Sequence, residues 1–303
     1  MMLPSDMRFL ERGWLSSNSL LLLGPDETAL IDSGYFTHAD QTVELVRHAL
    51  AGRTLNRLFN THLHSDHCGG NAAIQLAWPD SRTFIPPGSS DAVREWNEDG
   101  LTFRPTGQFC PTFTFHHVLS AGSHLMIASR RWDIHAAPGH DPDSVLLFQP
   151  DTGVLLSADA LWEHGFGVVF PEIVGEPGFS DVGRTLDLIE HLQPRIIVPG
   201  HGRVFTDLAG ALSRARERLQ LFMNDPLKHA SHAAKVLIKF HMMAIQDCSH
   251  EDLLNWCSSS SYLHLLQQAH YAQFTMHGWT NTLIDSLVKS GALLRQNDHI
   301  HNS

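Results

Sequence analysis

The sequence predicts a mixed α/β protein followed by a mostly helical C-terminal region. Over residues 7–223, short apolar runs typical of strands alternate with segments whose apolar residues recur at helical spacing. After the polar, proline-containing break at 224–226, the pattern becomes mostly helical. Hydrophobic residues make up 43% of the 303-residue chain, enough for a sizeable core. We therefore predict two domains, residues 1–225 and residues 226–303.

The N-terminal elements begin with a predicted hairpin. A Gly-Pro-Asp turn separates the apolar runs 19–23 and 28–32. Residues 38–51 have the spacing of an amphipathic helix, and a short strand should end near residue 61. Residues 80–120 are interrupted by prolines and predict a loop-rich segment, either the wall of a pocket or a surface excursion with a few buried aromatics.

Strand signals return in the second half of this region and then give way to helices. We predict strands at 125–128, 132–136, 144–148, 153–157 and 196–198. Helices are predicted at 180–192, 207–223 and 279–290.

Charge and cysteine content narrow the function classes. The net charge of −11 argues against a nucleic-acid partner, which needs a basic surface. The four cysteines form no C-x-x-C pair, and no secretory leader is evident, so we expect a reduced, cytoplasmic protein. No segment approaches 18 consecutive apolar residues, so we expect no membrane span.

The most informative stretch is 61–70, Thr-His-Leu-His-Ser-Asp-His-Cys-Gly-Gly. It places His62, His64, Asp66 and His67 within six positions. Histidine and aspartate are poor core residues unless paired, whereas imidazole and carboxylate are ligands for zinc and related metals. The two glycines that follow are expected to permit a tight turn into the next helix. This stretch therefore predicts a metal site.

Three further candidates follow predicted strands. His140 and His201 each end a Pro-Gly-His triplet, and Asp159 follows the apolar strand at 153–157. One catalytic zinc needs three protein ligands and an open position, so seven ligands suit two ions that share a carboxylate. The predicted ligands are His62, His64, Asp66, His67, His140, Asp159 and His201.

The H-x-H-x-D-H motif, followed in order by His, Asp and His, resembles the metallo-β-lactamase superfamily. The resemblance covers residues 7–223 and implies a four-layer αβ/βα sandwich with a dinuclear site at one edge of its two sheets. Glutamate stands at the position of His64 in the di-iron flavoprotein relatives. The plasmid-type lactamases often use a cysteine ligand and lack the equivalent of His67. The chain is therefore more similar to the glyoxalase II, lactonase and RNase Z branches.

The resemblance also implies a role for each ligand. His62, His64 and His140 would bind the first metal, Asp66, His67 and His201 the second, and Asp159 would bridge. Asp32, in the Leu-Ile-Asp-Ser-Gly segment 30–34, matches a family motif and would support the site from behind.

These expectations lead to a hydrolytic mechanism. A hydroxide bridging two divalent ions, with zinc as the default and iron or manganese as alternatives, would attack an ester, thioester, lactone or related carbonyl. Asp66 is the predicted catalytic residue, because it could orient this nucleophile or shuttle its proton. The alternatives are a metal-dependent phosphodiesterase or nuclease, a mononuclear iron sulfur dioxygenase, and a ligand-sensing regulator that contacts DNA.

Two regions should determine the substrate. Four side chains that follow the bridging aspartate either line an apolar pocket over the metals or close the core under a loop: Trp162, His164, Phe166 and Phe170. The end of the chain resembles a winged-helix element found in some lactamase-fold hydrolases. Because acidic residues dilute its lysines and arginine, we favour a pocket lid or a homodimer contact over DNA binding.

Overall fold

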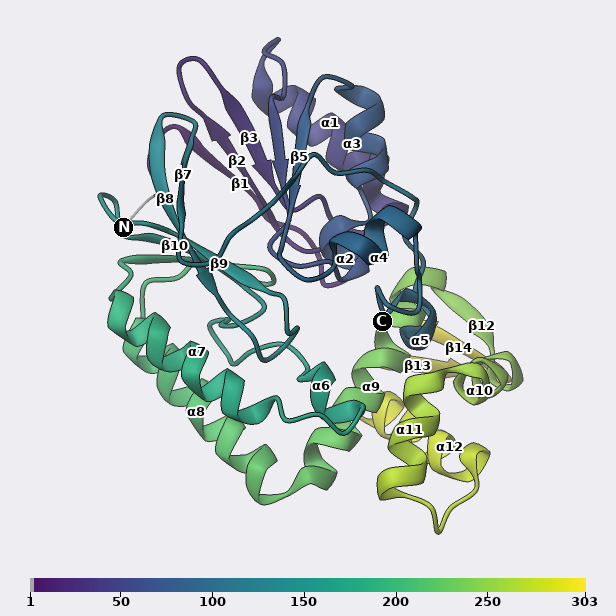
Figure 1. Ribbon diagram of the computed structural model, residues 1–303. Helices are drawn as coiled ribbons and strands as arrows, with labels where there is room; N and C mark the ends of the chain where they lie inside the picture. The colour runs from purple at the N-terminus through teal and green to yellow at the C-terminus, as the bar shows by residue number, and fades with distance from the viewer. Residues whose placement is uncertain (1–2) are drawn as a thin grey trace.

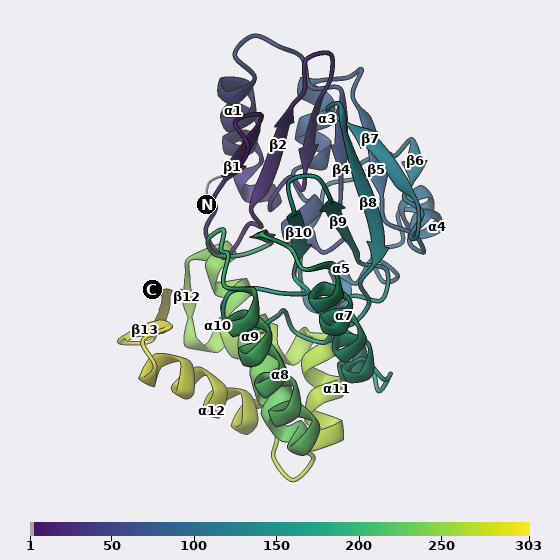
Figure 2. The same ribbon diagram turned by 90° about the vertical axis from the view of Figure 1, so that its left-hand side faces the viewer.

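The computed structural model describes residues 3–303 and places two β-sheets face to face with helices on both outer sides (Figure 1). One sheet has the strand order β1-β2-β3-β4-β5-β6, and the other has the order β11-β10-β9-β8-β7. Helices α1 and α3 cover the first sheet, and α7 and α8 lie side by side over the second (Figure 2). The predicted αβ/βα sandwich is confirmed.

The strands of the first sheet are β1 (Met7–Leu10), β2 (Ser19–Leu23), β3 (Thr28–Ile31), β4 (Arg57–Phe59), β5 (Arg82–Ile85) and β6 (His117–Val118). Those of the second are β7 (His124–Ile127), β8 (Arg130–Ala136), β9 (Val145–Gln149), β10 (Val154–Ala158) and β11 (Ile196–Pro199). The helices of this part are η1 (Phe36–His38), α1 (Ala39–Leu50), α2 (Ser65–Cys68), α3 (Asn71–Ala77), α4 (Ser90–Glu95), α5 (Phe103–Thr106), α6 (Phe170–Ile173), α7 (Phe179–Leu192) and α8 (Leu208–Asn224).

The central core lies between the two sheets. Alternate residues of each strand point inward, and they include Ile31, Phe59, Trp132 and Leu156. Strands β3, β4 and β5 pair in parallel, and so do β10 and β11. Parallel strands have their carboxyl ends at one edge of a sheet, and the segments that follow β4, β10 and β11 carry most of the predicted ligands there. His140 follows β8, which runs in the same direction as β10 because both are antiparallel to β9.

The expected glycine turn after the histidine motif has a different cause. Gly69 and Gly70 have φ of −62° and −84°, which any residue can adopt. A Cβ on Gly70 would overlap the carbonyl oxygen of Ser33, and one on Gly69 would lie 2.7 Å from the amide nitrogen of Phe36. Glycine is needed at both positions because the neighbouring backbone lies too close to accommodate a Cβ. The prediction that these glycines are needed for the conformation of a tight turn was wrong.

The C-terminal region contains helices and a small sheet. Its helices are α9 (Pro226–Ile245), α10 (His250–Ser259), α11 (Ser261–His270) and α12 (Met276–Lys289), and its strands are β12 (Asp247–Ser249), β13 (Leu293–Gln296) and β14 (His299–Asn302). The strands pair antiparallel in the order β12-β14-β13. The helical pattern did not predict β12, because a three-residue strand shows no periodicity. The break at residue 225 separates α8 from α9, and the division into two domains stays a prediction.

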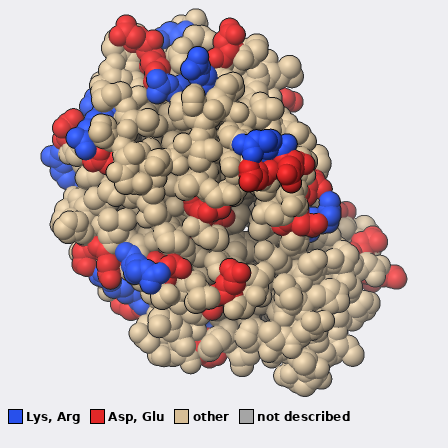
Figure 3. All heavy atoms as spheres, in the orientation of Figure 1, with Lys and Arg blue, Asp and Glu red and all other residues tan. Residues whose placement is uncertain are grey.

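The C-terminal elements form a separate apolar cluster around α9, α11 and α12. That cluster also contains Val168 and Ile173, from the segment that follows β10. On the face drawn in Figure 3, few lysines or arginines lie over these elements. Across residues 3–303, no helix is long and apolar enough to cross a membrane.

Candidate metal centre

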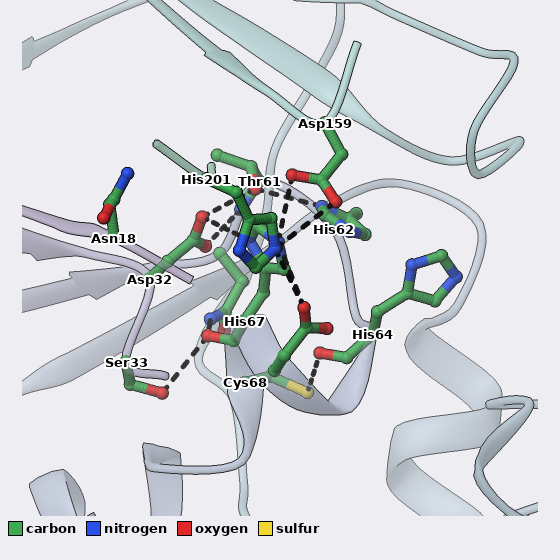
Figure 4. Close-up of polar contacts among 12 residues, drawn as sticks. Asn18, Asp32, Ser33, Thr61, His62, His64, His67, Cys68, Asp159 and His201 are labelled. Carbon is green, nitrogen blue, oxygen red and sulfur yellow. Dashed lines mark hydrogen bonds and ion pairs between the residues drawn. The ribbon is translucent and has the colours of Figure 1, made fainter. Parts of the chain in front are cut away.

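The seven predicted ligands converge at one edge of the sandwich. His62 and His64 lie in the loop after β4, and Asp66 and His67 lie on the short helix α2. The other three, His140, Asp159 and His201, follow β8, β10 and β11. Figure 4 shows five of the seven, His62, His64, His67, Asp159 and His201, gathered around one small space.

The ligands form two groups that could each hold an ion. One consists of His62, His64 and His140, and within it one ligand atom per residue lies within 4.8 Å of the others. The His64 Nδ1 and His140 Nε2 atoms are 2.8 Å apart. By the same criterion, the second group consists of Asp66, His67, Asp159 and His201.

Asp159 lies between the two groups. Its Oδ2 is 3.5 Å from Nε2 of His140 in the first group and 3.7 Å from Nε2 of His201 in the second. Its Oδ1 lies 3.4 Å from Nε2 of His67. One carboxylate that reaches both histidine sets has the position of a bridging ligand.

The donor atoms fit divalent cations. The buried Nε2 atoms of His62 and His67 have no hydrogen-bond partner among the described residues, a costly arrangement unless another species contacts them. Burial lowers the pKa of His64 and of His140 to about 4, so both rings are neutral, ligand-competent imidazoles at neutral pH.

The carboxylates around His67 make this pocket anionic. Burial alone would lower the pKa of His67, but Asp159, Asp32 and Asp66 together raise it well above its usual value. The same surplus of negative charge would stabilise a bound cation. The chemistry of the donor set therefore fits two ions held by imidazole and carboxylate, and it does not distinguish zinc from iron or manganese.

Asp32 supports the second group from behind, at the position its motif implied. Its Oδ2 lies 2.8 Å from His67 Nδ1 and accepts a hydrogen bond from the Thr61 hydroxyl at 2.8 Å. Its Oδ1 accepts from the Thr61 backbone N–H at 2.9 Å. Because Nδ1 of His67 bonds to Asp32, Nε2 is the atom that faces the centre (Figure 4).

Gly200 brings the backbone close to the ligands. A Cβ at this position would overlap Oδ1 of Asp159 and lie 2.9 Å from Cε1 of His67. The residue before His201 must therefore be glycine for the loop after β11 to approach the centre.

Cys68, which follows a ligand, belongs to the surrounding core. Its Sγ points away from the histidines, at 3.3 Å from the carbonyl oxygen of His64 and 3.8 Å from Sγ of Cys110 (Figure 4). Burial raises the pKa of the Cys68 thiol well above its usual value, so a thiolate ligand is disfavoured.

Two tryptophans lie against the open side of the second group. The Trp162 indole N–H donates to Oδ1 of Asp159 at 3.2 Å. Trp14 stacks on the ring of His201, with 5.3 Å between ring centroids, and is 56% exposed. Trp14 was not among the predicted site residues, because it lies in an irregular loop between β1 and β2, where no sequence pattern marks its position.

A cavity of about 830 Å³ opens over the centre. It is lined by His64, Asp66, His140, Asp159 and His201, together with side chains from α9. Gln108 and Thr106 of the loop-rich segment also line it, so that segment does wall a pocket.

The four predicted pocket residues separate into two classes. Trp162, His164 and Phe170 line the cavity. Phe166 does not, since it is 1% exposed and packs against Phe222 of α8, with 6.4 Å between ring centroids. A bridge between Trp162 and Gly165 turns the chain tightly, and the next side chain is directed into the core. For Phe166 the core interpretation replaces the pocket one.

The comparison with protein families agrees with this geometry. The model of the metallo-beta-lactamase superfamily matches residues 12–201. A hydroxyacylglutathione hydrolase of Thermosynechococcus vestitus is 29% identical over 159 residues, which cover 52% of this chain and 54% of that protein. The chain thus matches about half the length of such relatives. The beta-lactamase-like protein 2 homolog of Drosophila melanogaster is 26% identical over 242 residues and matches 74% of each chain.

Solved structures show the same fold. A metallo-beta-lactamase family protein of Thermus thermophilus aligns over 100% of both chains with a TM-score of 0.58 and 20% identity. A protein crystallised in a di-iron-bound form aligns over 69% of this chain and 98% of its own, with a TM-score of 0.51 and 22% identity. The family match, the relatives that are hydrolases and the paired ligand groups agree: the chain belongs to the metallo-beta-lactamase superfamily.

Proposed function

We propose that the chain is a dinuclear metal hydrolase that cleaves a small ester, thioester, lactone or related carbonyl compound, with zinc as its resident metal. The position of Asp159, within 3.7 Å of histidines from both ligand groups and at the wall of a large cavity, carries this proposal. The hydroxyacylglutathione hydrolases among the relatives support a thioester or ester substrate.

Two divalent ions at such a site lower the pKa of water and polarise a carbonyl group. The protein's own residues hold the geometry. Asp32 fixes the ring of His67, and the Val168 carbonyl lies 2.6 Å from Nδ1 of His140. Asp66 lines the cavity and lies 3.1 Å from Nε2 of His201, so it is placed to orient a nucleophile or accept its proton.

Two competing functions differ in metal and substrate. A phosphodiesterase would use the same centre on a nucleic acid, but the net charge of −11 supports a small-molecule partner instead. A sulfur dioxygenase would need a single iron, whereas two ligand groups lie among residues 3–303.

The test is metal analysis followed by a substrate panel. Purified protein should contain about two zinc ions per chain and hydrolyse at least one thioester, lactone or β-lactam in preference to a phosphodiester. One iron per chain with oxygen-dependent turnover would overturn the proposal, as would cleavage of phosphodiesters alone.

A further inference from the structure

The cavity wall formed by α8 and α9 carries two positive charges that have no ion-pair partner within residues 3–303. Four cationic side chains line the cavity: Arg203, Arg218, Lys235 and Lys239. Lys239 donates to the carbonyl oxygen of Ala292 at 2.7 Å and so holds the C-terminal sheet. Arg203 is exposed and lies 3.8 Å from Glu11.

The remaining two, Arg218 and Lys235, have no ion-pair partner within residues 3–303, although both are half-buried. Arg218 donates only to the carbonyl oxygen of Phe166, at 3.3 Å, and burial lowers the pKa of its guanidinium. Burial of an unpaired cation is costly, and both side chains line the cavity, where a bound anion would offset that cost.

His232 lines the same cavity and lies close to both cations. Burial, followed by the charges of Arg218 and Lys235, lowers the pKa of His232 to about 4. His232 and Lys235 lie three residues apart on α9 and therefore share a face. Helix α8, which carries Arg218, packs beside α9 (Figure 2).

The carboxylate side chains that line the cavity do not neutralise this wall. Asp66 and Asp159 belong to the metal centre, and Glu163 lies 3.9 Å from Nε2 of His164. The wall is nonetheless linked to the centre by one short segment. Trp162 donates to Asp159, and Gly165, three residues later, packs so closely on Arg218 that a Cβ there would lie 2.6 Å from its Nη1.

We propose that Arg218 and Lys235, with His232 beside them, form a subsite for the phosphate group of a phosphorylated acyl substrate, whose acyl carbonyl lies at the metal centre. Two unpaired full positive charges match a phosphate monoester, which carries about −1.5 to −2 at neutral pH, better than they match a single carboxylate. Between the two ends, Trp162, Phe170 and Phe240 provide apolar surface for the linking arm.

This inference rests on the proposed hydrolase function, and its test separates the two. The probes are S-butyryl pantetheine and its 4′-phosphorylated form, which differ only in the phosphate. With the zinc-loaded full chain, kcat/KM should be on the order of 10- to 100-fold higher for the phosphorylated probe. The double variant R218Q/K235Q should lose that ratio, because only the phosphorylated probe carries the group that these two cations bind.

Binding of 4′-phosphopantetheine, measured by calorimetry, tests the subsite without hydrolysis. Affinity should fall on the order of 10-fold or more in the double variant and stay unchanged in the control Lys228→Gln, whose side chain on α9 pairs with Asp225 instead of lining the cavity. Phosphopantetheine binding that depends on Arg218 and Lys235, without thioester hydrolysis, would support the subsite and refute the hydrolase.

Four results would overturn the subsite. One is equal kcat/KM for the two butyryl probes in the native chain. Another is phosphopantetheine binding that survives undiminished in the double variant, since the metal ions would then hold the probe through its thiol or its phosphate. A larger gain from a carboxylate-ended thioester, or tighter binding of single-stranded RNA lost in the same variant, would assign the wall to another ligand.

Discussion

Replacing Asp32 by asparagine should weaken the second ion without unfolding the protein. The amide oxygen can still accept from the Thr61 N–H, and the Thr61 hydroxyl can rotate to accept from the new amide NH₂. Nδ1 of His67 then faces a donor in place of a carboxylate oxygen. To accept a hydrogen bond from that donor, the ring must move its proton to Nε2, the atom that faces Asp159 and Asp66.

An Nε2 that carries a proton cannot bind a metal ion. Loss of such a supporting partner typically costs about 10- to 100-fold in metal affinity, or roughly 1.4–2.8 kcal/mol. Competition titration with a chromophoric chelator should show one ion retained near native affinity and one weakened by this factor. Asp26→Asn, an exposed carboxylate in the turn between β2 and β3, is the control and should leave both affinities unchanged. Native affinity for both ions in Asp32→Asn would show that this carboxylate does not orient His67.

Three more substitutions test other parts of the centre and its surroundings. Asp159→Ala should lower zinc content and hydrolysis together, as measured by metal analysis and turnover; full activity at unchanged stoichiometry would refute the bridging role. Gly200→Ala should displace Asp159, because the new methyl group would overlap its Oδ1. Metal affinity should then fall at least tenfold, and native zinc binding in this variant would contradict the steric argument. Phe166→Ala should lower the free energy of unfolding, measured by chemical denaturation, by about 3–5 kcal/mol and leave KM little changed. A raised KM at native stability would instead indicate that Phe166 contacts the substrate.

The ligands were predictable because their positions follow from local rules. The motif at 62–67 lies within one loop and one helical turn, and the single histidines and Asp159 each follow a strand within a few residues. Strand ends meet at a sheet edge, so chain order was sufficient to bring these residues together. Side-chain direction after a turn was not predictable in this way. Trp162 and Phe166 are both aromatic and four residues apart, yet one touches Asp159 and the other packs on α8.

The unpaired cations were missed for a related reason. In the sequence, Arg218 and Lys235 cannot be distinguished from charged residues on the solvent-exposed face of a helix. Only the packing of α8, α9 and the segment after β10 places them at a common cavity. Half-burial without a partner distinguishes them from Lys228 and Arg216, which are paired with acidic residues. That contrast appears only once the structure assigns partners.

The same packing makes the C-terminal region part of the site. Phe170 lies 4.8 Å from the ring of His64 and 6.0 Å from that of Tyr262 on α11, as centroid distances. Two residues earlier, Val168 lies in the apolar cluster of α9 and α12 and presents its carbonyl to His140. Movement of the C-terminal helices would therefore displace the backbone that orients a ligand of the first ion. Because α9 also lines the cavity, the wall of the cavity and the backbone that orients His140 depend on the same interface.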